Sequence, residues 1–118
     1  MKPLIHAQIS VKTHGGKIED YLPIHEFIDH SKSSVADVRH RAMLHSAWGI
    51  YLVGQVFGEI MTNSDGKKLS VRDIAEEHVL QDLGFIPTMQ DWLSKMPIEG
   101  WMSGTRKKRR VFDFDLED

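Results

Sequence analysis

The sequence contains no cysteine, which excludes disulfide bonds, thiolate zinc sites and cysteine nucleophiles. It also lacks any apolar run near the roughly 20 residues that a membrane-spanning helix needs, and its first residues, MKPLIHAQISVK, lack the apolar core of a signal peptide. We therefore expect a cytoplasmic protein that does not enter a membrane. No phosphate-binding loop, dinucleotide fingerprint, nucleophile elbow or HExxH zinc helix is present, so no familiar motif assigns a reaction.

What the sequence does have in excess is histidine, with seven in 118 residues. The remaining composition is ordinary for a globular protein, with 41% hydrophobic residues, 27% charged residues and a net charge of −2. This length is enough for one core but not for two, and neither a repeat nor a long linker divides the chain. We expect residues 1–104 to form a single helical domain and residues 105–118 to form a charged C-terminal tail.

Hydrophobic periodicity predicts a mainly α fold, a compact bundle of four to five helices with one small β-hairpin. The predicted helices cover residues 3–14, 23–32, 34–58, 71–83 and a short stretch from residue 88, although the alternation of residues 5–11 fits a strand equally well. The predicted strands, 59–62 and 68–71, flank a turn at residues 63–66. The stretch 34–58 is the longest and is predicted as one central helix, opened by a capping box of Ser34 and Asp37 and closed by Gly58.

Four-residue spacing predicts two histidine–aspartate pairs, each on one face of a helix: His25 with Asp29, and His78 with Asp82. His45 lies in line with the aliphatic positions of the predicted central helix. If the helices that carry the two pairs pack on either side of the central one, His45 lies between them. The five side chains together would then offer three nitrogens and up to two carboxylates to a divalent ion.

Such a mixed set suits zinc, manganese, iron or nickel better than calcium or magnesium, which prefer oxygen ligands alone. A bound ion could lower the pKa of a water molecule and direct it at a phosphoryl or carbonyl group. The first hypothesis is therefore a metal-dependent hydrolase of a phosphorylated or nucleotide substrate. The alternative is that the histidines are structural, because a histidine on an apolar face often needs only one hydrogen bond. His6 and His14 have no companions and are predicted to lie on the surface.

Several charged residues near this set in the sequence are candidates for orienting its ligands or for holding an anion: Asp37, His40, Lys32, Arg41 and Arg72. Asp37 and His40, three residues apart, are either an orienting pair or an ordinary surface pair. The three cationic side chains either hold an anion or are simply solvated.

Several uncommon strings occur in order along residues 20–102: HEFIDHSK (25–32), RHRAMLHS (39–46), TNSDGK (62–67), EEHVLQDLG (76–84) and PTMQDWL (87–93), closed by Trp101 and Met102. In these motifs the chain resembles a family of small, histidine-rich proteins of unknown function found in bacteriophage and bacterial genomes. The resemblance implies a phage or bacterial cytoplasmic origin and no mechanism. A looser similarity, to histidine–aspartate metal phosphohydrolases, lacks the adjacent His-Asp dipeptide of those enzymes.

The family pattern falls on residues that include the proposed ligands: His25, Asp29, Ser31, Lys32, His40, Arg41, His45, Asn63, Asp65, Gly66, His78 and Asp82. It does not reach the tail, where a basic run precedes acidic residues and has the composition of a contact with a protein or nucleic acid: Arg106, Lys107, Lys108, Arg109 and Arg110. The second hypothesis is therefore a non-enzymatic phage accessory protein that binds a host or virion partner partly through this tail. A disordered, solubilising tail is the other interpretation.

Overall fold

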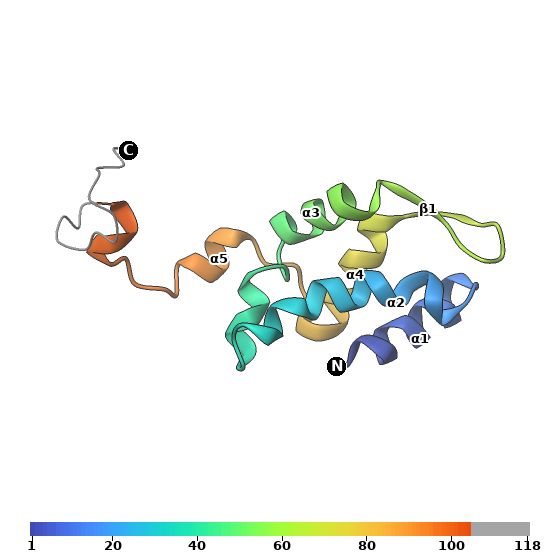
Figure 1. Cartoon of the computed structure of the whole chain (residues 1–118), viewed down its shortest axis with the longest axis horizontal. Helices are drawn as coiled ribbons and strands as arrows, with labels where there is room; N and C mark the ends of the chain where they lie inside the picture. The colour runs from blue at the N-terminus through green and yellow to red at the C-terminus, as the bar shows by residue number, and fades with distance from the viewer. Residues whose placement is uncertain (105–118) are drawn as a thin grey trace, which may run out of the picture.

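The computed structural model describes residues 1–104, in which five α-helices and one antiparallel hairpin follow one another along the chain (Figure 1). The elements are α1 (Pro3–His14), α2 (Ile18–Asp29), α3 (Ala47–Phe57), β1 (Ile60–Thr62), β2 (Lys68–Ser70), α4 (Val71–Leu83) and α5 (Met89–Leu93), with short 3-10 turns η1 (His30–Ser33), η2 (Val38–Ala42) and η3 (Gly100–Ser103). The predicted fold class, mainly α with one hairpin, is confirmed.

Two buried layers hold the helices together. The apolar layer joins α2 to α1, α3 and α4 through Ala7, Tyr21, Ile24, Ile28, Ile50, Val53, Val71, Ile74, Ala75 and Val79. Beside it lie four histidines that are each 0% exposed: His6, His25, His45 and His78. Burying an imidazole without a hydrogen-bond partner is unfavourable, so this second layer must contain its own partners.

The prediction of a single helix over residues 34–58 is wrong, because α3 begins only at Ala47. Ser46 ends the irregular segment before it and caps the helix, its Oγ accepting a hydrogen bond from the amide of Gly49 at 3.0 Å. Gly49 also has no Cβ, and the backbone of Leu44 occupies the space that a Cβ would need. The apolar periodicity of the stretch therefore hid a local capping signal and a close backbone approach.

The segment before α3 contains η2, which Asp37 opens by accepting a hydrogen bond from the amide of Arg39 at 2.9 Å. Ser34 lies just after η1, so the predicted capping box is not formed. The break changes where two histidines lie. In one continuous helix His40 and His45 would point about 140° apart, whereas here their rings meet edge to face with centroids 6.2 Å apart.

The other predicted elements are largely confirmed. α4 begins after Ser70, whose Oγ accepts from the amide of Asp73 at 3.3 Å, and ends at Gly84 in the left-handed conformation with φ of 80°. The hairpin pairs Ile60 with Ser70 and Thr62 with Lys68. α2 differs from the prediction: it begins at residue 18 and ends at residue 29, not 23 and 32, with the proline of the expected start inside the helix.

Candidate metal centre

Four side chains direct one polar atom each at a common point between α2, α4 and the start of α3. His45 Nε2 lies 2.9 Å from Asp82 Oδ2 and 3.5 Å from Asp29 Oδ1. His78 Nε2 lies 3.2 Å from Asp29 Oδ1 and 3.3 Å from Asp82 Oδ2. One potential ligand atom from each of the four residues lies within 4.8 Å of the other three. Two imidazole nitrogens and two carboxylate oxygens therefore converge.

These separations match those of neighbouring ligands around one ion. A regular tetrahedron with bonds of about 2.0–2.1 Å has ligand–ligand distances of about 3.3–3.4 Å, and neighbouring octahedral ligands at similar bond lengths lie about 3 Å apart. The spacing fits both geometries, so the donor set is what bears on the metal. Imidazole nitrogen with carboxylate oxygen favours zinc, manganese, iron or nickel over calcium and magnesium.

Three separate parts of the chain hold these four residues. Asp29 is the last residue of α2, while His78 and Asp82 lie one turn apart on α4. His45 lies just before α3, and its backbone is fixed at both ends: its amide donates to the carbonyl of Arg41 at 2.8 Å, and its carbonyl accepts from Nε1 of Trp92 at 2.9 Å. The backbone that carries each of the four side chains is therefore held by helical or tertiary hydrogen bonds.

The two carboxylates are strongly biased toward the ionised form. Burial would raise the pKa of Asp82, but hydrogen bonds from three histidines, led by His45, hold that pKa far below its usual range. Burial also acts to raise the pKa of Asp29, but the hydrogen bond from His78 and the nearby charges of His78 and His45 together lower that pKa. For His78 the balance is reversed: burial acts to lower its pKa, but hydrogen bonds to the two aspartates raise it. The site thus attracts positive charge, as a proton on His78 or as a metal ion in its place.

A chain of hydrogen bonds determines that Nδ1 of His78 carries a proton. His78 Nδ1 lies 2.9 Å from His25 Nδ1, His25 Nε2 lies 2.8 Å from Ser10 Oγ, and the Ser10 hydroxyl lies 3.1 Å from the carbonyl of His6. That carbonyl can only accept, so the Ser10 hydroxyl donates to it and accepts from His25 Nε2–H. His25 Nδ1 then accepts from His78 Nδ1–H. This arrangement leaves the Nε2 lone pair of a neutral His78 available to a metal.

Burial and the neighbouring His78 and His6 lower the pKa of His25 to about 3, so His25 is neutral, as this chain requires. His6 holds the other oxygen of Asp82: its Nε2 lies 3.2 Å from Asp82 Oδ1, and its Nδ1 lies 2.6 Å from Gln81 Oε1. Asp82 therefore uses one carboxylate oxygen for orientation and the other for the convergence point. The buried Nδ1 of His45 has no hydrogen-bond partner among residues 1–104.

A second group of nitrogens, from His6, His25 and His78, also lies within 4.8 Å of one another. The rings of His6 and His78 are stacked, with centroids 3.7 Å apart and planes inclined by 19°. Imidazole binds a metal in the plane of its ring, and stacked rings direct their lone pairs alongside one another instead of toward a shared ion. The convergence of two histidines with two aspartates is therefore the better metal site.

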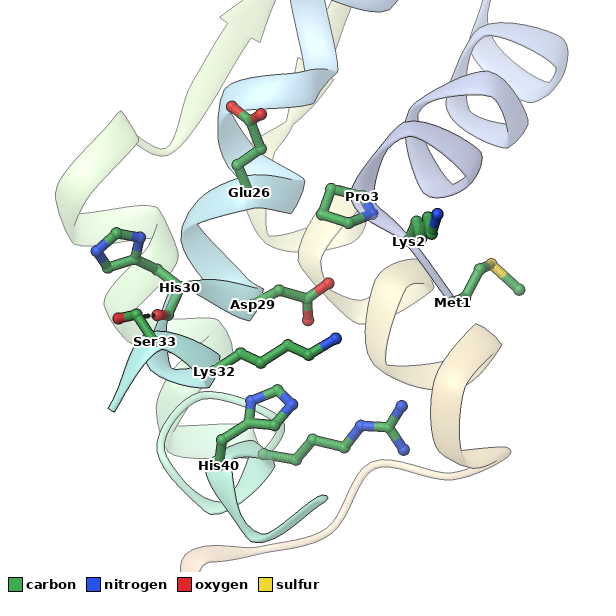
Figure 2. A pocket seen from close by; sticks show the side chains of 10 residues that line it. Met1, Lys2, Pro3, Glu26, Asp29, His30, Lys32, Ser33 and His40 are labelled. Atoms are coloured by element: carbon green, nitrogen blue, oxygen red, sulfur yellow. Dashed lines mark hydrogen bonds between the residues drawn. The ribbon is translucent and has the colours of Figure 1, made fainter. Parts of the chain in front are cut away.

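The convergence point opens to the surface at Asp29, whose side chain is 15% exposed, whereas that of Asp82 is 2% exposed. A pocket of about 680 Å³ lies against it, lined by Met1, Lys2, Pro3, Glu26, Asp29, His30, Lys32, Ser33, His40 and Arg41. Figure 2 shows the carboxylate of Asp29 and the end of Lys32 directed into the same space, with the ring of His40 beside them. A small molecule in this pocket would reach the exposed side of the site.

A family profile matches residues 1–102, which includes every residue of the convergence point and of the pocket. The chain belongs to the family described as Domain of unknown function (DUF6915). Searches of curated proteins and of solved structures each returned no match. Among residues 1–104 of this DUF6915 domain, none of the helices combines the length and apolar character needed to cross a bilayer.

Of the five ligands predicted from the sequence, the DUF6915 fold brings four to one point: His45, His78, Asp29 and Asp82. His25 lies one ring further out, and its two nitrogens face His78 and Ser10. It belongs to the stacked group of three histidines and not to the group that contains the aspartates.

Of the five charged residues predicted to orient ligands or to hold an anion, three line the pocket and two lie elsewhere. Lys32, Arg41 and His40 line the pocket. Burial lowers the pKa of His40, and its Nδ1 lies 3.3 Å from Ser31 Oγ; within residues 1–104 its ring forms no hydrogen bond or ion pair with the Asp37 carboxylate.

Asp37 is exposed and pairs instead with Arg39 at 2.8 Å, an interaction that lowers its pKa to about 2. Arg72 is also exposed; its side chain lies along Gly54 of α3, and it is not among the residues that line the pocket. The predicted partner-binding run at residues 106–110 lies outside the described residues.

The contribution of α1 to the site was not predicted from the sequence. His6 was predicted to lie on the surface and is fully buried, while His14 is partly buried and lies 2.9 Å from Glu77. One signal was present: His6 and Ser10 are four residues apart on the predicted first helix and share a face with Ala7, a small apolar residue. That face is the one buried against the histidine layer.

Proposed function

We propose that this DUF6915 domain binds one divalent transition metal ion through His45, His78, Asp29 and Asp82. The observation that carries the proposal is the convergence of two imidazole nitrogens and two carboxylate oxygens at ligand spacing. Two further features support it. Both carboxylates are held ionised. The hydrogen-bond chain from Ser10 to His78 leaves the lone pair of His78 Nε2 available to an ion when the ring is neutral.

We further propose that the bound ion serves a hydrolase whose substrate is a phosphorylated compound or a nucleotide. A divalent ion lowers the pKa of a bound water, which then supplies the nucleophile at neutral pH. Hydrolysis joins the water oxygen to phosphorus and breaks the bond to the leaving oxygen, which takes up a proton. Asp29 supports this role because it is both a proposed ligand and part of the pocket wall. The alternative, partner binding through residues 106–110, rests on residues outside the described part of the chain.

Calorimetric titration of the metal-stripped protein with zinc, manganese, iron(II) or nickel tests the metal site. We expect one equivalent of at least one of these ions to bind, with much weaker binding of magnesium, because magnesium prefers an all-oxygen shell. Elemental analysis of the reloaded protein should give one ion per chain. A protein that binds none of the four ions would contradict the proposal.

Hydrolysis is tested by incubating the metal-loaded protein with a panel of phosphate monoesters and nucleotides and measuring released inorganic phosphate. We expect release that needs the ion and that disappears in Asp29→Asn. If no member of the panel releases phosphate, the ion has a structural or binding role and the hydrolase proposal is wrong.

We expect His25→Ala to weaken metal binding without removing a ligand. His25 accepts the hydrogen bond that orients His78, and loss of such an outer partner typically lowers metal affinity about 10–100-fold. Ser10→Ala removes the next member of the chain and should have a smaller effect in the same direction. Titration of both variants with the tightest-binding ion provides the measurement, and wild-type affinity in His25→Ala would rule out the orienting role.

A further inference from the structure

We propose that the pocket beside Asp29 binds the phosphate group of a small, polar phosphate monoester in its dianionic form, and that it binds this group more tightly when the metal site is occupied. This inference rests on the proposed function and names the ligand class, the residues that hold it and its dependence on the ion. The residues that would hold the phosphate are Lys32 and Arg41, with Lys2 at the rim.

Unpaired positive charge in the pocket is the first observation. Three cationic side chains line it, those of Lys2, Lys32 and Arg41. Within residues 1–104 none of the three forms an ion pair, although Arg41 is only partly exposed. An arginine that is partly removed from water and has no carboxylate partner can satisfy its donors with an anionic ligand.

The charge balance of the pocket depends on the metal. Glu26 and Asp29 also line it, and Asp82 lies just behind. A divalent ion held by Asp29 and Asp82 would cancel the charges of these two carboxylates, leaving three cationic side chains against Glu26 alone. Without the ion, the same two carboxylates face only the N-terminal ammonium, which lies 3.5 Å from Asp82 Oδ1, and at most one proton on His78, so the pocket is less positive and holds an anion less tightly. Metal and anion should therefore each raise the affinity for the other, because such coupling between two sites is reciprocal.

A phosphate monoester fits this arrangement better than a diester. Near neutral pH a monoester carries a charge of about −1.5 to −2 and three free oxygens, whereas a diester carries one charge and has two free oxygens. A guanidinium can donate hydrogen bonds to two phosphate oxygens at once. The third oxygen remains for the ion or for a lysine ammonium. Figure 2 shows that Lys32 reaches the space in front of the Asp29 carboxylate, where such a phosphate would lie.

The remaining lining indicates what the phosphate is attached to. The volume of about 680 Å³ is much larger than one phosphate group, so there is room for the rest of a small molecule. Among the described residues that line the pocket, none is phenylalanine, tyrosine or tryptophan, and most are polar or charged; the rings of His30 and His40 offer a smaller stacking surface than those residues would. A nucleobase usually binds by stacking on an aromatic ring. We therefore expect a polar organic group on the phosphate, without a base.

The test is a calorimetric titration of the full chain with three probes: inorganic phosphate, glycerol 3-phosphate and dimethyl phosphate. Each is added to the metal-free protein and to the protein loaded with the tightest-binding ion, in wild type, Lys32→Ala, Arg41→Ala and Arg39→Ala. Arg39→Ala is the matched control, because Arg39 is exposed, pairs with Asp37 and does not line the pocket. Metal content is measured in parallel for every variant.

We expect the two variants that each remove a cationic side chain, Lys32→Ala and Arg41→Ala, to keep their metal and to bind inorganic phosphate and glycerol 3-phosphate about tenfold or more weakly than wild type. Arg39→Ala should match wild type, and dimethyl phosphate should bind much more weakly than glycerol 3-phosphate. Loaded wild-type protein that binds neither inorganic phosphate nor glycerol 3-phosphate overturns this inference and leaves the metal site standing. Equal phosphate binding with and without the ion, or equal binding of the diester, also overturns it. Failure to bind metal at all overturns the proposed function itself.

Discussion

His45→Ala and Asp82→Asn should each abolish stoichiometric metal binding. His45→Ala removes one nitrogen ligand, and Asp82→Asn replaces a buried, ionised oxygen ligand by a neutral amide while keeping its shape. Both residues lie at the convergence point, so the loss in affinity should exceed the roughly 10–100-fold that follows removal of an outer partner. Elemental analysis after dialysis, together with calorimetric titration, provides the measurement.

Matched controls exist on the same elements. His14 and Glu77 form a second histidine–carboxylate pair between α1 and α4, at 2.9 Å, outside both candidate groups of metal ligands. His14→Ala and Glu77→Gln should therefore bind metal as wild type does. Because Asp82 is buried among three imidazoles, its replacement could unfold the chain, so circular dichroism accompanies each titration. Asp29→Asn, at the exposed side of the site, is the milder variant that keeps the test decisive if Asp82→Asn does not fold.

Metal loading should stabilise the fold and raise its melting temperature. The four proposed ligands come from α2, α4 and the segment before α3, so an ion held by them would bind tightly only when these parts are assembled. A ligand at about 100 times its dissociation constant adds about 2.7 kcal/mol to the free energy of unfolding, and for a chain of this size this corresponds to a rise in Tm of about 10 °C. Chelation should reverse the rise.

Differential scanning calorimetry with and without the tightest-binding ion measures this shift. Magnesium serves as the control ion for charge screening, and His45→Ala is the control for binding elsewhere on the surface. We expect neither control to show the shift. A similar rise in His45→Ala would mean that the stabilising ion binds at some other place, and no rise in wild type would mean that the four residues hold no ion.

The local parts of this architecture could be predicted from the sequence. Residues four apart on a helix must share a face, so the pairing of His78 with Asp82 followed from spacing alone. The hairpin and the start of α4 were equally local, because a turn-forming tetrapeptide and a serine cap specify them within a few residues. Each of these features depends on short stretches of chain.

The parts that could not be predicted depend on contacts between distant residues. His6 is buried because it meets Gln81 and Asp82 on α4, about 75 positions away, and nothing near residue 6 indicates that neighbour. The boundary of α3 was missed for a different reason. The periodicity of residues 34–58 fits a helix throughout, but the cap at Ser46 and the approach of Leu44 to Gly49 favour a break.

This break also explains why the site could be only partly predicted. His45 was assigned to a continuous helix, yet it reaches the convergence point from an irregular segment that Trp92 and Arg41 hold in place. His25 was assigned as a ligand because it lies one turn from Asp29, but its ring faces His78 and Ser10 instead. Spacing identifies which residues share a face, whereas the direction of each ring nitrogen depends on partners contributed by other helices.

The most direct test of the central claim is anomalous diffraction from a crystal of the metal-loaded protein, recorded on both sides of the absorption edge of the bound metal. We expect one strong peak within about 2.0–2.2 Å of His45 Nε2, His78 Nε2 and an oxygen from each of Asp29 and Asp82. A peak that lies only against other residues, or a loaded crystal without a peak between these four side chains, would contradict this claim.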